Sequence, residues 1–162
     1  MSTWKIAFSF LVPIFVLVVI PGIIHYGLEP LAFQNVFSTF TGILFLLTGI
    51  SFLAWSSALF VAFGNGTPGP WFATEKLVIL GPYRFVRNPM NIAVITTLWG
   101  ETLLFGSFYI LAWSILYWLI SVVWLKWWEE PRLEQKFGEI YLRYKKEVPN
   151  WIPLSKPIEF DP

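Results

Sequence analysis

The sequence predicts an all-α integral membrane protein with about four transmembrane helices, a tight helical hairpin between the last two, and a C-terminal amphipathic helix on the cytosolic side. Its 162 residues are 56% hydrophobic and only 13% charged, a far more apolar balance than soluble domains have. The apolar residues also form runs of the length, about 20 residues, that a helix needs to cross a bilayer. We interpret residues 1–162 as a single membrane domain.

Composition argues against metal and nucleic-acid functions. The chain has no cysteine and a single histidine, His25, so a disulfide framework and a Cys/His metal site are both excluded. The net charge is +1, and no basic stripe stands apart from the membrane flanks. We therefore expect no metal and no nucleic acid among the partners, and the sequence predicts no particular oligomeric state.

The first apolar run predicts a transmembrane helix over residues 5–24. This run is longer than the apolar region of a secretory signal, and no small-residue cleavage site follows it, so we expect it to be retained. Pro13 and Pro21 within the run predict a kink and an early end of the helix.

A second span is predicted over residues 36–63. Small residues recur there at helical spacing, which permits the close approach of a neighbouring helix in lipid. These residues are Gly42, Gly49, Ser56, Ser57 and Ala58. Residues 64–70 contain too much Gly and Pro to continue the helix and predict a loop.

The second half of the chain predicts a helical hairpin. Residues 71–89 carry charged side chains and are expected at the membrane interface. A third span over residues 90–105 and a fourth over residues 108–128 are separated only by a turn at Gly106 and Ser107. The third span contains Glu101, which is either a functional group or a protonated structural one.

A charged helix is predicted from Glu129 to Pro149, which ends it. Apolar and aromatic residues fall on one face at spacings of three or four, namely Leu133, Phe137, Tyr141, Tyr144 and Val148. In the four-span arrangement, all eleven Lys and Arg residues lie on one side of the membrane. The positive-inside rule therefore predicts that both termini are cytosolic.

Two polar clusters are brought to the same membrane face by the hairpin. The first covers residues 81–91 and contains Gly81, Tyr83, Arg87, Asn88, Pro89 and Asn91. The second covers residues 129–153 and contains Glu129, Glu130, Phe137, Gly138, Tyr141, Tyr144 and Trp151. Their order and spacing resemble the isoprenylcysteine carboxyl methyltransferase and phospholipid methyltransferase superfamily of membrane enzymes. That pattern is Gly-x-Tyr-x-x-x-Arg-His-Pro-x-Tyr-x-Gly before a span, then Glu-Glu and Phe-Gly-x-x-Tyr-x-x-Tyr after the hairpin.

The resemblance covers about residues 64–153 and implies a methyltransferase that uses S-adenosyl-L-methionine. Three positions depart from the superfamily pattern: Asn88 stands in place of His, Asn91 in place of Tyr, and Ala93 in place of Gly. Asn cannot exchange a proton near neutral pH, so a histidine base at position 88 is excluded. The departures bear on the identity of the substrate more than on cofactor binding.

Arg87 and Glu130 are the residues that we expect to act in catalysis. The cofactor carries a carboxylate, an ammonium and a sulfonium, and Arg87 offers a planar fork for a carboxylate while a glutamate can receive a cation. Because the last two spans have nearly equal lengths, we expect the hairpin to set Arg87 beside Glu130. The full set of expected cofactor contacts is Gly81, Tyr83, Arg87, Asn88, Asn91, Glu129, Glu130, Tyr141, Tyr144 and Trp151.

The sequence leaves the acceptor open. A lipid-like or otherwise apolar molecule carrying a carboxylate, an amine or a thiol fits a site at the cytosolic membrane face. A carboxylate needs no base, whereas an ammonium or a thiol must first lose a proton, for which Glu130 is the expected base. The alternative is a catalytically silent membrane protein that retains the methyltransferase fold as a binding or assembly module.

Overall fold

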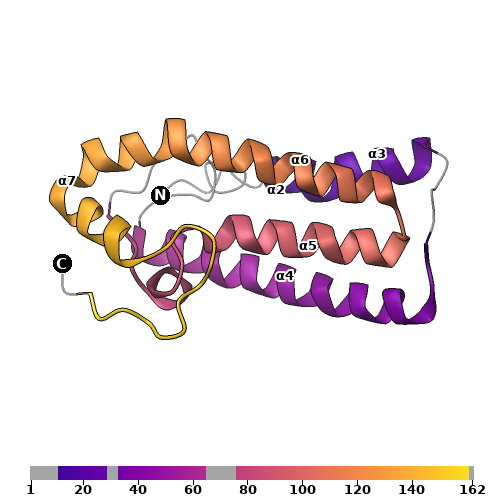
Figure 1. The fold of residues 1–162 in the computed structure, drawn as a ribbon, viewed down its shortest axis with the longest axis horizontal. Coiled ribbons are helices and arrows are strands. Elements are labelled where there is room, and N and C mark those ends of the chain that lie inside the picture. The colour runs from indigo at the N-terminus through magenta and orange to yellow at the C-terminus, as the bar shows by residue number, and fades with distance from the viewer. Residues whose placement is uncertain (1–10, 29–32, 65–75, 161–162) are drawn as a thin grey trace.

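The computed structural model describes residues 11–28, 33–64 and 76–160. In these ranges the chain forms helices and connecting segments, and contains no strand. Figure 1 shows the long helices lying alongside one another, with the turn after α5 at one end and the C-terminal segment at the other. The predicted all-helical class is confirmed for the described residues.

The first helix is continuous from Leu11 to Gly27. It comprises α2 (Leu11–Ile14), a π-helical turn η1 (Phe15–Val19) and α3 (Ile20–Gly27). Residues 5–10 of the predicted span lie outside the described residues. The expected early end at Pro21 is wrong, because the helix runs on for six residues beyond this proline.

The π turn explains how the helix accommodates Pro21. A proline ring clashes with the carbonyl four residues before it, and a wider turn moves that carbonyl away. The Ile20 N–H donates to the carbonyl of Phe15, five residues back, and Pro21 has no N–H to continue this pattern to Val16. The Val16 carbonyl instead accepts a hydrogen bond of 3.1 Å from Trp113 Nε1, which ties the first helix to α6.

Helices α4 (Val36–Gly64) and α5 (Pro89–Phe105) pack closely along their length. A Cβ atom at Gly42 would lie 2.6 Å from the backbone nitrogen of Leu104, and one at Gly49 would lie 2.7 Å from that of Thr97. Only glycine permits these approaches, so the expected role in close helix packing is confirmed for Gly42 and Gly49, whereas Ala58 is exposed.

The predicted hairpin turn is present at Gly106 and Ser107. Gly106 has a positive φ of 61° and ends α5, and the Ser107 hydroxyl accepts a hydrogen bond from the Ile110 N–H at the start of α6 (Phe108–Trp124). The Phe33 N–H donates to the Gly106 carbonyl at 3.1 Å. The connection before α4 and the hairpin turn therefore lie at the same end of the helices.

Helix α6 continues without interruption into a second π turn, η3 (Leu125–Glu129), and then into α7 (Glu130–Glu147). Among the described residues, two helical stretches are long and apolar enough to cross a membrane, Val36–Gly64 and a part of Phe108–Glu147. Leu11–Gly27 is a shorter apolar helix, and α5 has 17 residues. The four-span topology and the cytosolic termini stay predictions.

Helix α7 is broken at Gly138, which has φ 54° and ψ −132°. The residues after this break turn back toward the segment before α5, as the yellow end of α7 in Figure 1 shows. A short 3-10 turn, η2 (Gly81–Arg84), lies in that segment. The sequence did not predict the break, and it determines where the C-terminal residues lie.

Candidate active site

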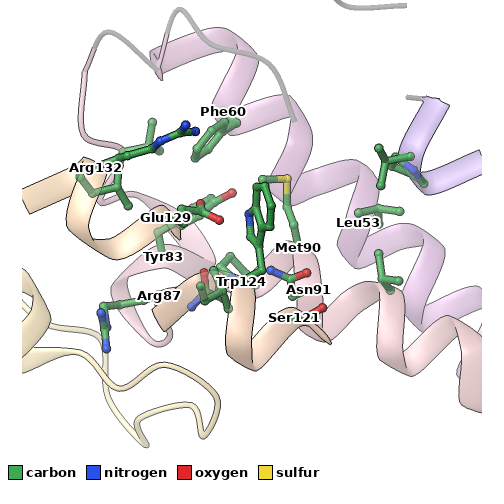
Figure 2. A pocket seen from close by; sticks show the side chains of 18 of the residues that line it. Leu53, Phe60, Tyr83, Arg87, Met90, Asn91, Ser121, Trp124, Glu129 and Arg132 are labelled. Carbon is green, nitrogen blue, oxygen red and sulfur yellow. The ribbon is translucent and has the colours of Figure 1, made fainter. Parts of the chain in front are cut away.

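A cavity of about 390 Å³ lies between the helices, within the size range of small-molecule sites. One end is polar and aromatic, and is formed by η2, the start of α5, η3 and α7. The other end is apolar and runs between the first helix, α4, α5 and α6, where it is lined by Val12, Pro13, Val16, Leu53, Val94 and Ile120. The cavity therefore joins a polar region to the interior of the helical bundle (Figure 2).

Seven of the ten residues expected to contact the cofactor line this cavity: Tyr83, Arg87, Asn88, Asn91, Glu129, Tyr141 and Tyr144. The other three do not line it. Gly81 opens η2 with a positive φ of 54°, and the ring of Trp151 packs edge-on against Trp118. The third is Glu130, whose carboxylate is directed to Arg87 instead.

Arg87 and Glu130 are in contact although 43 positions separate them in sequence. Arg87 Nη1 lies 2.7 Å from Glu130 Oε1, and both side chains are about nine-tenths buried. Arg87 Nε donates to the Val148 carbonyl at 2.9 Å, and Nη1 also donates to the Tyr141 hydroxyl at 3.4 Å. The expected proximity is present, and most of the guanidinium is engaged by the protein itself.

Glu130 is equally well satisfied. Its Oε1 also accepts a hydrogen bond of 3.0 Å from Asn150 Nδ2, and its Oε2 forms a 2.6 Å ion pair with Lys145. Burial raises the pKa of the Glu130 carboxyl, but the Lys145 hydrogen bond and the charges of Arg87 and Lys145 outweigh burial and hold the pKa below its usual value. Such a carboxylate is a weak base.

Glu129 has the opposite surroundings. Its carboxylate is directed into the cavity (Figure 2), and it forms no hydrogen bond or ion pair with any residue that the structure describes. Burial and the neighbouring Glu130 charge raise the pKa of the Glu129 carboxyl. The ion pairs of Glu130 thus hold it in the protein structure, whereas the raised pKa and cavity position of Glu129 make it the candidate functional carboxyl.

The second π turn sets this difference between the two glutamates. The Glu130 N–H donates to the carbonyl of Leu125, five residues back, and Pro131 follows directly. This repeats the arrangement at Pro21, where a widened turn relieves the clash between a proline ring and the preceding helix. The wider turn changes the helical register, so that Glu129 faces the cavity while Glu130 faces Arg87.

The structure adds cavity residues that sequence reasoning did not select. Arg132 lies one turn after Glu129, and it forms no hydrogen bond or ion pair within the described ranges. Figure 2 shows its guanidinium extending toward Phe60 of α4. Trp124 of α6 also lines the cavity. The spacing of three between Glu129 and Arg132 was the only sequence signal that could have placed Arg132 on the same face.

Asn91 is held by α6. The hydroxyl of Tyr117 donates to Asn91 Oδ1 at 2.9 Å, and both residues line the cavity. The amide nitrogen of Asn91 therefore keeps its donor capacity for a ligand. Asn88, by contrast, donates its amide to the side chain of Asn150 in the C-terminal segment.

Comparison with known proteins gives a family. The sequence model of the phospholipid methyltransferase family matches residues 37–140, which is more than half of the chain and includes α4, α5, α6 and both glutamates of η3 and α7. A search of curated proteins and a search of solved structures gave no match. The matched range holds the hairpin and most of the polar residues that line the cavity. The chain therefore belongs to the phospholipid methyltransferase family of integral membrane methyltransferases.

Proposed function

We propose that this protein transfers the methyl group of S-adenosyl-L-methionine to an amphipathic acceptor at the cytosolic face of the membrane. One observation carries the proposal: a single cavity connects a charged and aromatic end to an apolar end between the helices. A cofactor with charged groups fits the first end, and the apolar part of an acceptor fits the second. Membership of a methyltransferase family supports the reaction type.

The residues at the polar end fit the chemistry of the cofactor. S-adenosyl-L-methionine supplies a methyl group activated by a sulfonium, and it also carries an ammonium, a carboxylate and an adenine. Arg132 offers a guanidinium for the carboxylate of the cofactor, which leaves the carboxylate of Glu129 for the acceptor. Aromatic faces for adenine come from Phe60, Tyr83 and Trp124.

The acceptor that this cavity favours is an amine. Glu129 has no hydrogen-bond or ion-pair partner in the described part of the chain, and such a carboxylate attracts an ammonium and repels a second carboxylate. Glu129 accepts a proton from the ammonium, and the amine lone pair then forms a bond to the methyl carbon as the carbon–sulfur bond breaks and its electron pair remains on sulfur. We assign this base to Glu129 in place of Glu130, because Arg87, Lys145 and Asn150 already hold both oxygens of Glu130.

A matched series of acceptors tests this proposal. Purified protein in detergent or vesicles is given methyl-labelled S-adenosyl-L-methionine and three amphiphiles that share one acyl chain and differ only in an amine, a carboxylate or a thiol head. We expect label in the amine product and little in the other two. Preferential labelling of the carboxylate would overturn the amine assignment. Absence of transfer to extracted membrane lipids, together with absence of S-adenosylhomocysteine binding, would instead support the catalytically silent module.

A further inference from the structure

The segment after Gly138 returns to the cavity because the helix is broken there. Glu130 and Lys145 are 15 residues apart in α7, and an unbroken helix would separate them by about 22 Å at 1.5 Å per residue. In the structure Lys145 Nζ lies 2.6 Å from Glu130 Oε2 and 2.7 Å from Glu134 Oε1. The ion pairs of Lys145 therefore join the two halves of α7 across the break.

The glycine is required by its backbone angles and not by crowding. At φ 54° and ψ −132° an L side chain is strained, yet a Cβ atom at Gly138 would meet nothing within 4 Å. Replacing Gly138 with alanine thus changes the backbone preference and no side-chain contact. This makes Gly138 a clean position for testing the bend.

The chain beyond the bend is fastened along the segment that lines the polar end. The Arg87 N–H donates to the Pro149 carbonyl at 2.9 Å, the Leu154 N–H to the Phe85 carbonyl at 2.9 Å, and the Ile158 N–H to the Arg84 carbonyl at 3.1 Å. The Tyr144 hydroxyl donates to the Tyr83 carbonyl at 2.7 Å, and Arg84 Nε to the Ile158 carbonyl at 2.6 Å.

We propose that residues 139–160 form a strap that holds the polar end of the cavity in its binding shape, with Gly138 and Lys145 as its positioning residues. Tyr141 and Tyr144 of the strap line the cavity, and the strap fixes Tyr83, Arg87 and Asn88 on the opposite wall. Arg87 and Glu130 then serve as a latch, because Arg87 binds the Val148 carbonyl of the strap and Glu130 binds Lys145 and Asn150 of the strap. This inference depends on the proposed function only in the part of its test that measures ligand binding.

Three variants test the strap. Lys145→Met removes both ion pairs, Lys145→Arg retains the charge, and Gly138→Ala strains the bend. Lys146→Met is the matched control, because Lys146 is the next residue, is exposed, and has no hydrogen-bond or ion-pair partner among the described residues. Gly22→Ala is the matched glycine control, because a Cβ atom there also meets nothing within 4 Å while φ is helical.

Two measurements are made on the full-length protein in detergent. The first is amide hydrogen exchange of Arg87, Leu154 and Ile158, whose N–H groups fasten the strap. The second is the dissociation constant of S-adenosylhomocysteine together with the separate KM and kcat of methyl transfer. We expect Lys145→Met and Gly138→Ala to accelerate hydrogen exchange at these amides. Both variants should also bind S-adenosylhomocysteine about fivefold or more weakly, and the KM for the cofactor should change more than kcat. Lys145→Arg and both controls should remain near the original protein.

Amide hydrogen exchange in α4 and α5 distinguishes opening of the strap from general unfolding. If the variants only release the strap, the amides of these two helices remain protected. If the amides of Arg87, Leu154 and Ile158 keep their protection in Lys145→Met and Gly138→Ala, the proposed role of the strap is wrong. Equal loss in Lys146→Met also overturns it, because the effect is then one of net charge. If the original protein binds no S-adenosylhomocysteine, the proposed function fails, whereas the exchange result still decides the strap.

Discussion

Glu129 and Glu130 are neighbours in sequence, yet their carboxylates have opposite surroundings. Glu130 is held by Arg87, Lys145 and Asn150, while Glu129 faces the cavity without a partner among the described residues. Glu130 therefore fastens the C-terminal segment, and in our proposal Glu129 meets the ligand. Consecutive residues of a helix point in different directions, and the π turn before Pro131 sets their directions relative to α6.

The first prediction is that methyl transfer depends on pH through Glu129. Burial and the adjacent Glu130 charge raise the pKa of Glu129, so its proton persists to higher pH than in an ordinary glutamate. The ionised form, which accepts the proton of the acceptor ammonium, exists above that raised pKa and is lost as the pH falls through it. We expect kcat/KM for the amine acceptor to fall on acidification by up to about tenfold per pH unit.

Methyl-transfer rates between neutral and mildly acidic pH measure this dependence, with Glu129→Gln as the comparison. Glutamine cannot titrate, so the variant should transfer the methyl group more slowly at neutral pH and show a flatter profile. A profile that stays equally steep in Glu129→Gln would assign the titrating group to another residue.

The second prediction concerns the latch. Replacing Arg87 with Lys retains the charge but loses the planar fork that reaches both Glu130 and the Val148 carbonyl, and replacing Glu130 with Gln removes the charge that binds Arg87 and Lys145. Each change should reduce methyl transfer by roughly tenfold or more, on the order of 1.4 kcal/mol of transition-state stabilisation. Methyl-transfer assays with thermal unfolding in parallel provide the measurement.

Glu147→Gln is the control for these variants. Its ion pair with Arg143 spans one helical turn on the surface, where such pairs contribute little. Full activity is expected in this variant. Near-normal turnover in both Arg87→Lys and Glu130→Gln would show that methyl transfer does not depend on the latch between these residues.

The sequence predicts the backbone of this site better than its side chains. The run at residues 36–63 and the turn at Gly106 specify α4 and the hairpin, and the equal lengths of the last two spans correctly place Arg87 beside Glu130. Two local features escape such reasoning. The widened helical turn before Pro131 determines which glutamate faces the cavity. The bend at Gly138 determines which C-terminal residues lie at the polar end of the cavity. A single proline or glycine within a helical pattern does not specify either geometry.

The third prediction concerns the contact between α4 and α5. A Cβ atom at Gly49 would clash with Thr97 Oγ1 and lie 2.7 Å from the Thr97 backbone nitrogen, so Gly49→Ala must push the two helices apart. We expect a loss of about 1–3 kcal/mol in unfolding free energy, as for other overpacked contacts. Thermal or denaturant unfolding in detergent measures it. Gly22→Ala, which meets no atom within 4 Å, should cause no loss, and equal stability of the two variants would contradict the close packing.

The last prediction assigns Arg132 to the carboxylate of the cofactor. Arg132 lines the cavity one turn after Glu129 and has no hydrogen-bond or ion-pair partner among the residues that the structure describes, so its guanidinium is available to a carboxylate. S-adenosylhomocysteine carries the ammonium and carboxylate of its amino-acid portion, whereas methylthioadenosine lacks both and keeps the adenosine. Arg132→Gln should therefore weaken S-adenosylhomocysteine binding about tenfold, a loss typical of one charge-assisted contact, and leave methylthioadenosine binding nearly unchanged. Competition binding with both ligands measures the two affinities in the same preparation. Equal weakening of both would place Arg132 beside the adenosine or in the structure of the cavity, and would remove it from the amino-acid site.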